Sequence, residues 1–409
     1  MFIEALKTNL MLARVGVMIF SFLAGQAIMA AADDYVWLHV DGKYIKTSPS
    51  ANPPNLIFVA AGVAIDQESG ATSRSADADA TYIKGKGCNI VRFSINTLPK
   101  PQCCNTQYGT CDKAITSFID PHVQSFKSHQ LYVFFDEHEY FHSYNSGDSW
   151  MPNGAVWNST QIQAWINDWV TLATKYKDEP WVAGYELCNE PKGVTATVIR
   201  QAYMDCITAI RKVDTRHIIF LGNDNYTHTV NMKEVWGAVS FKPDSLYNQV
   251  VFAFHEYTNA YNPSQVAPVL DTIQNTYNVP VFCTEFGPDI TVGSPTAAQR
   301  QQFETDMFAM FKPRQIGWTI WHYMGGSGPD YTAAWYPAAT DQASPIPKLG
   351  TAIAPVKPKA FSSSAVKGSG MHYGISGKLL KNGPPSKRAE SNLYKRSVAP
   401  DGPDIDLQR

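Results

Sequence analysis

The chain has 409 residues, a formal net charge of −2 and 12% aromatic residues. This length allows a full hydrophobic core, and single α/β barrel domains often reach about 250 residues or more. The near-neutral charge argues against nucleic acid or an anionic membrane surface as the main partner, because both favour basic patches.

The first 32 residues have the pattern of an export signal. Lys7 and Arg14 precede an apolar run from Val15 to Ala30, which is short for a bilayer span, and small residues continue to Ala32. We expect cleavage after Ala32 and a secreted, extracellular protein, with an uncleaved signal anchor as the alternative. Two glycosylation sequons agree with secretion from a eukaryotic host: Asn158-Ser159-Thr160 and Asn225-Tyr226-Thr227.

The seven cysteines fit an oxidising compartment, although their odd number leaves at least one unpaired. Cys103, Cys104 and Cys111 share one polar loop, so we expect a short-loop disulfide to Cys111. Cys188 and Cys283 lie inside apolar runs, which is typical of buried thiols. The cysteine spacings do not resemble a zinc site.

In chain order, the segment from Trp37 to Lys46 predicts a small hairpin that turns at Asp41-Gly42. Eight short, almost continuously apolar runs follow, as is typical of strands buried on both faces of a parallel sheet. The runs are Leu56–Ala60, Asn89–Phe93, Leu131–Phe135, Val182–Leu187, His217–Leu221, Val250–Phe254, Val281–Thr284 and Ile316–Trp321.

Helical patterns lie between these runs. Apolar residues recur every three or four positions over Ile162–Ala173, and Val198–Val213 predicts another helix. Ser294-Pro295 predicts an N-cap and a first-turn proline for a third helix. Eight strands with intervening helices predict an α/β fold, a (β/α)8 barrel, although an eighth helix is not obvious and 331–355 is expected to close the barrel irregularly.

Three segments follow from these patterns: a signal peptide at 1–32, a single catalytic barrel domain at 33–355 and a disordered tail at 356–409. The tail is rich in Ser, Pro and Gly, lacks an apolar period and holds no Trp. We interpret its dibasic pairs, Lys387-Arg388 and Lys395-Arg396, as surface charge, with protease cleavage as the alternative.

Two glutamates follow or end predicted strands, where barrel enzymes carry their active sites. Glu190 follows the fourth strand and Glu285 ends the seventh. Such a pair fits glycosidic bond cleavage, in which one carboxyl group protonates the leaving oxygen and the other attacks or stabilises the sugar. A separation of about 5–5.5 Å would mean retention of anomeric configuration, and about 6.5–9.5 Å would mean inversion.

The run Leu187-Cys188-Asn189-Glu190-Pro191 resembles the signature of glycoside hydrolase family 5, the cellulase-type family of the retaining barrel clan. The resemblance extends in order over residues 56 to 325. It includes the strand-end residues Arg92, His138, His255, Tyr257 and Trp321. Together with Asn189, Glu190 and Glu285, these make eight matching positions in the family's order.

The resemblance implies that Glu190 is the acid/base and Glu285 the nucleophile. Arg92 and the Tyr257 hydroxyl would lower the pKa of Glu285 by charge and hydrogen bonding. Asn189 would hold the sugar's 2-hydroxyl. The remaining substrate-binding positions are His138 and His255, for hydroxyls or carboxylate orientation, and Trp321, for the floor of the sugar subsite. No metal or other cofactor is required.

Several residues have competing interpretations. Glu186 and Glu256 lie near the pair, but strand alternation sends Glu256 away from His255. Either Glu137 or Glu139 beside His138 is a further candidate for substrate contact. Ordinary structural roles are the alternative for the named residues: an ion pair for Arg92, core imidazoles for His138 and His255, and packing for Trp321. Residues that are either sugar platforms or core are Trp150, Trp157, Trp318, Trp335 and Tyr140.

The segments Gly317–Trp321 and Gly328–Tyr331 resemble the endoglucanases of family 5. We therefore predict a secreted, monomeric endo-β-1,4-glucanase that acts on a β-linked polysaccharide and contacts neither nucleic acid nor, after signal cleavage, a membrane. The enzyme alternatives are a mannanase, a β-1,3-glucanase, a xyloglucanase and a glycolipid hydrolase. Outside enzymes, the alternatives are a non-catalytic carbohydrate-binding barrel and a cell-wall or host-interaction protein.

Overall fold

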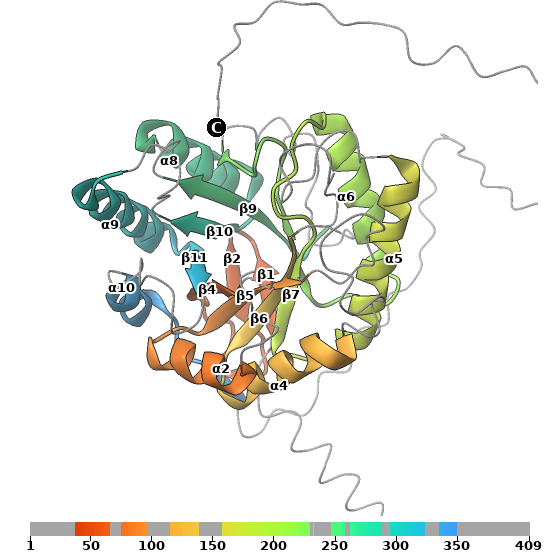
Figure 1. Cartoon of the computed structure of the whole chain (residues 1–409), viewed down its shortest axis with the longest axis horizontal. Helices are drawn as coiled ribbons and strands as arrows, with labels where there is room; N and C mark the ends of the chain where they lie inside the picture. Colours follow the sequence, from red (N-terminus) through yellow and green to blue (C-terminus); the bar gives the residue numbers. More distant parts are fainter. Residues whose placement is uncertain are drawn as a thin grey trace, which may run out of the picture. The chain divides into compact units, whose positions relative to one another are not determined.

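The computed structural model describes residues 37–65, 75–95, 115–138, 158–229, 232, 247–257, 262–287, 295–323 and 335–349. The predicted signal, the loop with Cys103, Cys104 and Cys111, and the predicted tail lie outside these residues. The described chain forms a closed barrel of eight parallel strands (Figure 1), which confirms the predicted (β/α)8 fold. The strands are β4 (Ala61–Ile65), β5 (Ile90–Ile95), β6 (Tyr132–Glu137), β7 (Val182–Glu186), β8 (Ile218–Leu221), β9 (Val250–Tyr257), β10 (Val281–Gly287) and β11 (Gly317–Tyr323).

Helices surround the barrel (Figure 1) and bury one apolar face against the outward-pointing strand residues. In α5 the predicted stripe is confirmed, because Trp165, Ile166 and Trp169 are all buried. No helix in the described ranges has the length and apolar content needed to cross a membrane. The described helices are α2 (Ala76–Gly85), α4 (Asp120–Ser128), α5 (Ser159–Tyr176), α6 (Ala196–Ile210), α8 (Pro263–Thr272), α9 (Ala297–Arg314) and α10 (Trp335–Gln342), with π-helical turns at Ile115–Ile119 and Ile273–Tyr277.

A second apolar cluster fills the inside of the barrel. Phe134 stacks on Phe220 with ring centroids 4.6 Å apart and meets the edge of Phe282 at 5.5 Å. The hairpin of β1 (Leu38–Asp41) and β2 (Tyr44–Thr47) adds Leu38 and Ile45 to this cluster. Since Trp181, at the start of β7, also belongs to the cluster, the hairpin closes the N-terminal end of the barrel. The C-terminal end is left for polar side chains.

The prediction for the first barrel strand is wrong. Leu56–Ala60 precedes the strand, and β4 begins at Ala61. Phe58 is buried in the cluster inside the barrel and donates its backbone N–H to the Ile45 carbonyl of the hairpin at 2.8 Å. Of this run only Phe58 and Ala60 are buried, and Leu56 is exposed. Packing against the hairpin therefore leaves an apolar run that resembles a strand.

Two further details differ from expectation. Thr296, not Ser294, caps α9, because its hydroxyl accepts from Gln299 N while the Gln299 side chain accepts from Thr296 N. Ser294 itself lies outside the described residues. The segment expected to close the barrel irregularly contains α10, the helix that follows the eighth barrel strand. It ends in β12 (Lys348–Leu349), which pairs with β3 (Ala51–Asn52).

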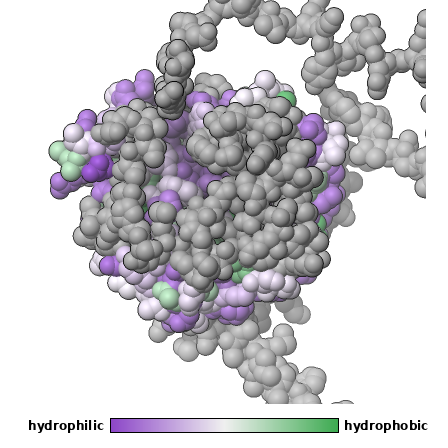
Figure 2. Space-filling view, viewed as in Figure 1, coloured by the Kyte–Doolittle hydropathy of each residue, from purple (hydrophilic) through white to green (hydrophobic). Residues whose placement is uncertain are grey.

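The described surface is mainly hydrophilic. Figure 2 shows purple and pale side chains over most of the coloured atoms on this face. Among the described residues, the exposed large hydrophobic side chains are Leu56 and Val198. Neither of these two side chains forms a continuous apolar patch.

The packing inside the barrel predicts the cost of a cavity. We expect Phe134→Ala to lower the free energy of unfolding by about 3–5 kcal/mol, because a fully buried ring loses its contacts with Phe220 and Phe282. Chemical denaturation measures this change. Val198→Ala, on the exposed face of α6, is the control and should stay within about 0.5 kcal/mol of the parent.

Candidate active site

Glu190 lies just beyond β7 on a segment whose backbone carbonyls accept three side-chain hydrogen bonds. The indole N–H groups of Trp165 and Trp169 on α5 both donate to the Leu187 carbonyl, at 2.8 and 3.1 Å. The Thr227 hydroxyl donates to the Asn189 carbonyl at 2.8 Å. These bonds fix the backbone on both sides of Cys188, so the Glu190 side chain starts from a rigid position although it follows the strand.

Glu285 lies within β10, where the strand register shifts. In the pairing with β9, Cys283 lies opposite Phe254 and Glu285 lies opposite His255, so Thr284 is the extra residue of a bulge. Bulges re-aim side chains, and this one lets Thr284 and Glu285 both approach His255. The Thr284 hydroxyl lies 3.0 Å from His255 Nε2, and Glu285 Oε2 lies 4.0 Å from His255 Nδ1.

Both oxygens of Glu285 have hydrogen-bond donors. Arg92 NH1 donates to Oε2 at 2.7 Å, and the Tyr257 hydroxyl donates to Oε1 at 2.5 Å. Burial raises the pKa of Glu285, but the charges of His255 and Arg92 and the Tyr257 hydrogen bond lower it by more, to about 2. Glu285 is therefore a carboxylate at any ordinary working pH.

Glu190 has the opposite electrostatic environment. Burial raises its pKa, and the nearby Glu285 charge raises it further, against the hydrogen bond from His255. His255 Nδ1 lies 2.7 Å from Glu190 Oε1. Burial lowers the pKa of His255, but the surrounding Glu285, Glu186 and Glu190 carboxyl groups raise it to about 9. The raised pKa values of Glu190 and His255 favour a proton shared by this pair, whereas the lowered pKa of Glu285 keeps the neighbouring carboxyl group ionised.

Arg92 joins the parts of the site from the inside of the barrel. It is fully buried on β5, and besides Glu285 it donates to Glu186 Oε2 through Nε at 2.7 Å. Its NH2 group donates to Asn189 Oδ1 at 2.6 Å and lies 3.0 Å from Asp136 Oδ2. One guanidinium thereby orients four side chains from three strand ends, those of β6, β7 and β10.

The ring of His138 lies parallel to that of Trp321, with centroids 4.8 Å apart and 5° between the planes. His138 Nδ1 lies 2.7 Å from Asp136 Oδ2, and its Nε2 lies 3.2 Å from Asn189 Nδ2. Burial lowers the pKa of His138, and the Asp136 charge raises it by more. Nevertheless, Arg92 turns the Asn189 amide so that its NH2 group faces Nε2, which requires Nε2 to accept and favours the neutral imidazole.

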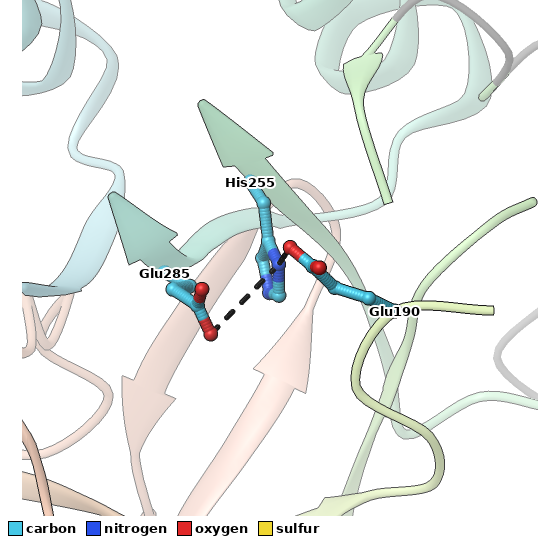
Figure 3. A group of neighbouring side chains, drawn as sticks. All are labelled: Glu190, His255 and Glu285. Carbon is cyan, nitrogen blue, oxygen red and sulfur yellow. Dashed lines mark hydrogen bonds and ion pairs between the residues drawn. The ribbon is translucent and has the colours of Figure 1, made fainter. Parts of the chain in front are cut away.

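Glu190, on the segment after β7, His255 on β9 and Glu285 on β10 point toward one another (Figure 3). One atom of each that could bind a metal lies within 4.8 Å of the others. A divalent cation would need these atoms free. However, Glu285 Oε2 accepts from Arg92, a permanent cation, and His255 Nδ1 is bonded to Glu190. The group fits proton transfer between paired carboxyl groups better than metal binding.

The match to a family model decides the classification. Residues 60–327 match the cellulase family, glycosyl hydrolase family 5. The chain belongs to this family. It is therefore a glycoside hydrolase, and the resemblance seen in the Leu187–Pro191 run is confirmed.

The relatives are distant. A beta-xylosidase of Phanerodontia chrysosporium is 24% identical over 276 residues, 60% of this chain and 56% of that protein. Endoglucanase E-5 of Thermobifida fusca is 26% identical over 140 residues, 34% of this chain and 29% of that protein. The chain thus spans about half or less of the length of these two curated relatives.

Solved structures share the fold. XacCel5A in complex with cellopentaose aligns with a TM-score of 0.55 at 20% identity, over 70% of this chain and 99% of that one. The catalytic domain of Thermobifida fusca endoglucanase Cel5A aligns with a TM-score of 0.56 at 18% identity, over 75% and 97%. At these identities the alignments establish the barrel and nothing finer.

In this family 5 chain, the structure brings all eight sequence-predicted positions together. Hydrogen bonds link Arg92 to Asn189 and Glu285, and Glu285 to Tyr257. Glu190 is bonded to His255, which lies 4.0 Å from Glu285, and His138 joins Asn189 to the ring of Trp321. All come from the C-terminal ends of β5, β6, β7, β9, β10 and β11, although Arg92 lies deeper, in the middle of β5.

The competing residues are also placed. Glu256 turns away from His255 and accepts from the Thr229 hydroxyl at 2.6 Å, as strand alternation predicted. Glu137 is buried, and its carbonyl accepts from Asn189 N at 3.3 Å. Trp318 is fully buried in the outer core, so it is not a sugar platform. Tyr140, Glu139, Trp150 and Trp157, and the side chain of Trp335, lie outside the described residues.

Sequence reasoning missed two residues that hold the site. Asp136 accepts from Ser94 and His138 and forms an ion pair with Arg92, and Glu186 accepts from Arg92. A signal existed for Asp136, because it lies two residues before His138 and strand alternation puts both on one face. For Glu186, only its position four residues before Glu190 hinted at a nearby role.

The predicted thiols and sequons can be partly checked. Cys188 and Cys283 are free and buried, as expected. Asn158 caps α5 by accepting from Gln161 N at 3.0 Å. Asn225 is exposed at the start of three consecutive residues with positive φ, which lie after β8. Both asparagines are thus at the surface of their elements, but glycosylation itself stays a prediction.

The Tyr257 contact predicts a specific change in pH dependence. Tyr257→Phe removes a hydrogen bond to the charged Glu285, which is worth about 1.5–3 kcal/mol, so the pKa of Glu285 should rise. In its expected role as nucleophile Glu285 has to be ionised, so the acid limb of kcat/KM should move to higher pH by about one unit or more. A pH series of kcat/KM measures it. Tyr44→Phe, on the hairpin at the other end of the barrel, should leave the limb in place.

Proposed function

We propose that this family 5 enzyme is a retaining endo-β-1,4-glucanase in which Glu285 is the nucleophile and Glu190 the acid/base. The observation that supports these roles most directly is the difference between the two carboxyl groups. Glu285 accepts from Arg92 and Tyr257 and has a lowered pKa, whereas Glu190 is paired with His255 and has a raised pKa. Unequal carboxyl environments are the usual basis for dividing acid and nucleophile roles.

In the first step of the proposed reaction, a Glu285 oxygen attacks the anomeric carbon while Glu190 gives its proton to the leaving glycosidic oxygen. In the second step, Glu190 removes a proton from water, and this water displaces Glu285 from the sugar. The spacing supports retention, because oxygens of the two groups lie within 4.8 Å, closer than the roughly 6.5–9.5 Å of inverting pairs.

The glycone sugar would lie against Trp321 beside Asn189. Asn189 Nδ2 has two protons and one of them faces His138, so the second is free for the sugar's 2-hydroxyl. That contact gains strength as charge develops at the anomeric carbon. Arg92 also lies 5.8 Å from the centre of the Trp321 ring, which keeps the platform and the nucleophile in one connected group.

The choice of β-1,4-glucan is supported by the names of relatives. Curated relatives from Thermobifida fusca and Butyrivibrio fibrisolvens are endoglucanases, and one solved neighbour holds cellopentaose. The relative matched over 60% of this chain is a beta-xylosidase, which makes a xylose-containing β-glycan and exo action the second candidate. The segments 139–157 after β6 and 324–334 after β11, which extend from the same end of the barrel as the site, lie outside the described residues.

The decisive experiment assays reducing-sugar release from soluble β-1,4-glucan, mannan, β-1,3-glucan and xylan. We expect cleavage of β-1,4-glucan to be lost by several orders of magnitude in Glu285→Gln, since the covalent step is removed. Glu190→Gln should lose roughly 10²–10⁴-fold. Glu304→Gln, which changes a buried glutamate on α9, is the matched control and should keep the activity. Cleavage of another polymer instead would contradict the assigned substrate.

The two roles can be separated by adding azide. With an activated aryl β-glycoside, Glu190→Ala should be rescued by azide to a β-glycosyl azide, and Glu285→Ala to the α-anomer. Proton NMR of the product distinguishes the two, and it also shows whether the first sugar released by the parent enzyme is the β-anomer. The reverse pairing of variant and anomer would mean that the roles are exchanged.

We also propose that the protein is secreted, on the basis of the charged and apolar pattern in residues 1–32 and the two sequons. The mature protein should then begin at or near Asp33 and lose mass on treatment with an N-glycosidase. N-terminal sequencing and mass spectrometry of protein from the culture medium test this. An intact N-terminus on protein found in the cytosol would contradict it.

A further inference from the structure

Glu186 is a fully buried carboxylate at the end of β7. It takes part in neither the proposed nucleophilic attack nor the proposed proton transfer. Its Oε2 accepts from Arg92 Nε at 2.7 Å. Its Oε1 has no hydrogen-bond partner among the described residues and lies 3.8 Å from His255 Nε2. Burying an ionised carboxylate with one oxygen unpaired costs free energy, so the arrangement needs a reason beyond packing.

The two contacts of Glu186 lead to the two catalytic groups. Arg92 donates to Glu285, and His255 is bonded to Glu190, each at 2.7 Å. We propose that Glu186 is a positioning residue whose charge holds the Arg92 guanidinium and the His255 imidazole in place against the nucleophile and the acid/base. This inference rests on the proposed function and adds to it a third carboxyl group that never touches the sugar.

The first consequence concerns the covalent intermediate. Arg92 faces three carboxylates in the free enzyme, namely Glu186, Glu285 and Asp136. When Glu285 forms the ester with the sugar, its negative charge disappears. Glu186 and Asp136 then remain to pair with the guanidinium, so Arg92 keeps its position until water releases the sugar and Glu285 is ionised again.

The second consequence concerns the proton shared by Glu190 and His255. Three carboxyl groups lie around the His255 ring: Glu186 on β7, Glu190 just after β7 and Glu285 on β10. Arg92 on β5 acts through its bonds to Glu186 and Glu285. The Nδ1 atom of His228 lies 3.1 Å from the His255 carbonyl oxygen. Of these groups, Glu186 is a fixed anion next to Nε2. Its charge favours keeping the proton on the pair, so the acid stays protonated to higher pH.

Glu186→Gln tests the charge with little change in shape, because a glutamine oxygen can still accept from Arg92 Nε. We expect the alkaline limb of kcat/KM to fall by about 1–2 pH units, since an anion 3.8 Å from His255 is removed. The pKa of the His255 imidazole, followed by ¹⁵N NMR of histidine-labelled protein, should fall by a similar amount. This second readout needs no substrate.

The matched control is Glu256→Gln. Glu256 is also buried and adjacent to His255 on β9, but it turns to Thr229 and away from the catalytic pair. It should leave both the alkaline limb and the His255 pKa where they are in the parent. Glu186→Asp keeps the charge at a greater distance, so it should restore part of the shift.

An unchanged His255 pKa in folded Glu186→Gln overturns the proposal, and so does an equal shift in Glu256→Gln. If Glu186→Gln does not fold, Glu186→Asp decides by itself: a smaller fall of the same sign supports the proposal, and no fall overturns it. The two proposals fail separately. An enzyme inactive on every polymer with a shifted His255 pKa would contradict only the proposed substrate, and an active enzyme with an unshifted pKa would contradict only the role of Glu186.

Discussion

The site depends on one buried cation. Arg92 is fully enclosed by the barrel and has carboxylate or amide partners from β6, β7, the segment after β7 and β10. Removing an ion from water costs several kcal/mol, and that cost is offset only when charge and hydrogen bonds are both satisfied. Without Arg92, three carboxylates would face one another in a region of low dielectric. The positions of Glu285 and Asn189 therefore follow from where the guanidinium lies.

The layers below Arg92 make this possible. Phe134, Phe220 and Phe282 fill the barrel, and the hairpin closes the N-terminal end, so the polar residues stand on a close-packed apolar base. From outside, two indoles of α5 hold the carbonyl of Leu187. Charge interactions are stronger in rigid surroundings of low dielectric. The groups around Glu190 and Glu285 can therefore shift the pKa values of these neighbouring residues in opposite directions.

His255 links the two halves of the chemistry. The bulge in β10 brings the Thr284 hydroxyl to Nε2 of its ring and Glu285 to within 4.0 Å of Nδ1, the nitrogen that is bonded to Glu190. Because the imidazole is bonded to Glu190 and lies 3.8 Å from Glu186, its charge responds to both. The difference between the two carboxyl groups, on which the proposed roles rest, is thus a property of the group of residues around Arg92 and His255 and does not belong to either glutamate alone.

The sequence by itself determined the barrel and the eight positions of the candidate site, because buried parallel strands leave continuous apolar runs and the site residues follow them in a recognisable order. It failed where different contacts leave the same pattern: Leu56–Ala60 is as apolar as a strand, but its buried residues Phe58 and Ala60 precede the strand and pack with the hairpin. Only the tertiary structure decided what Asp136 and Glu186 do. Arg92 is 94 residues from Glu186 and 193 from Glu285, and no local pattern records which distant carboxylates share one guanidinium.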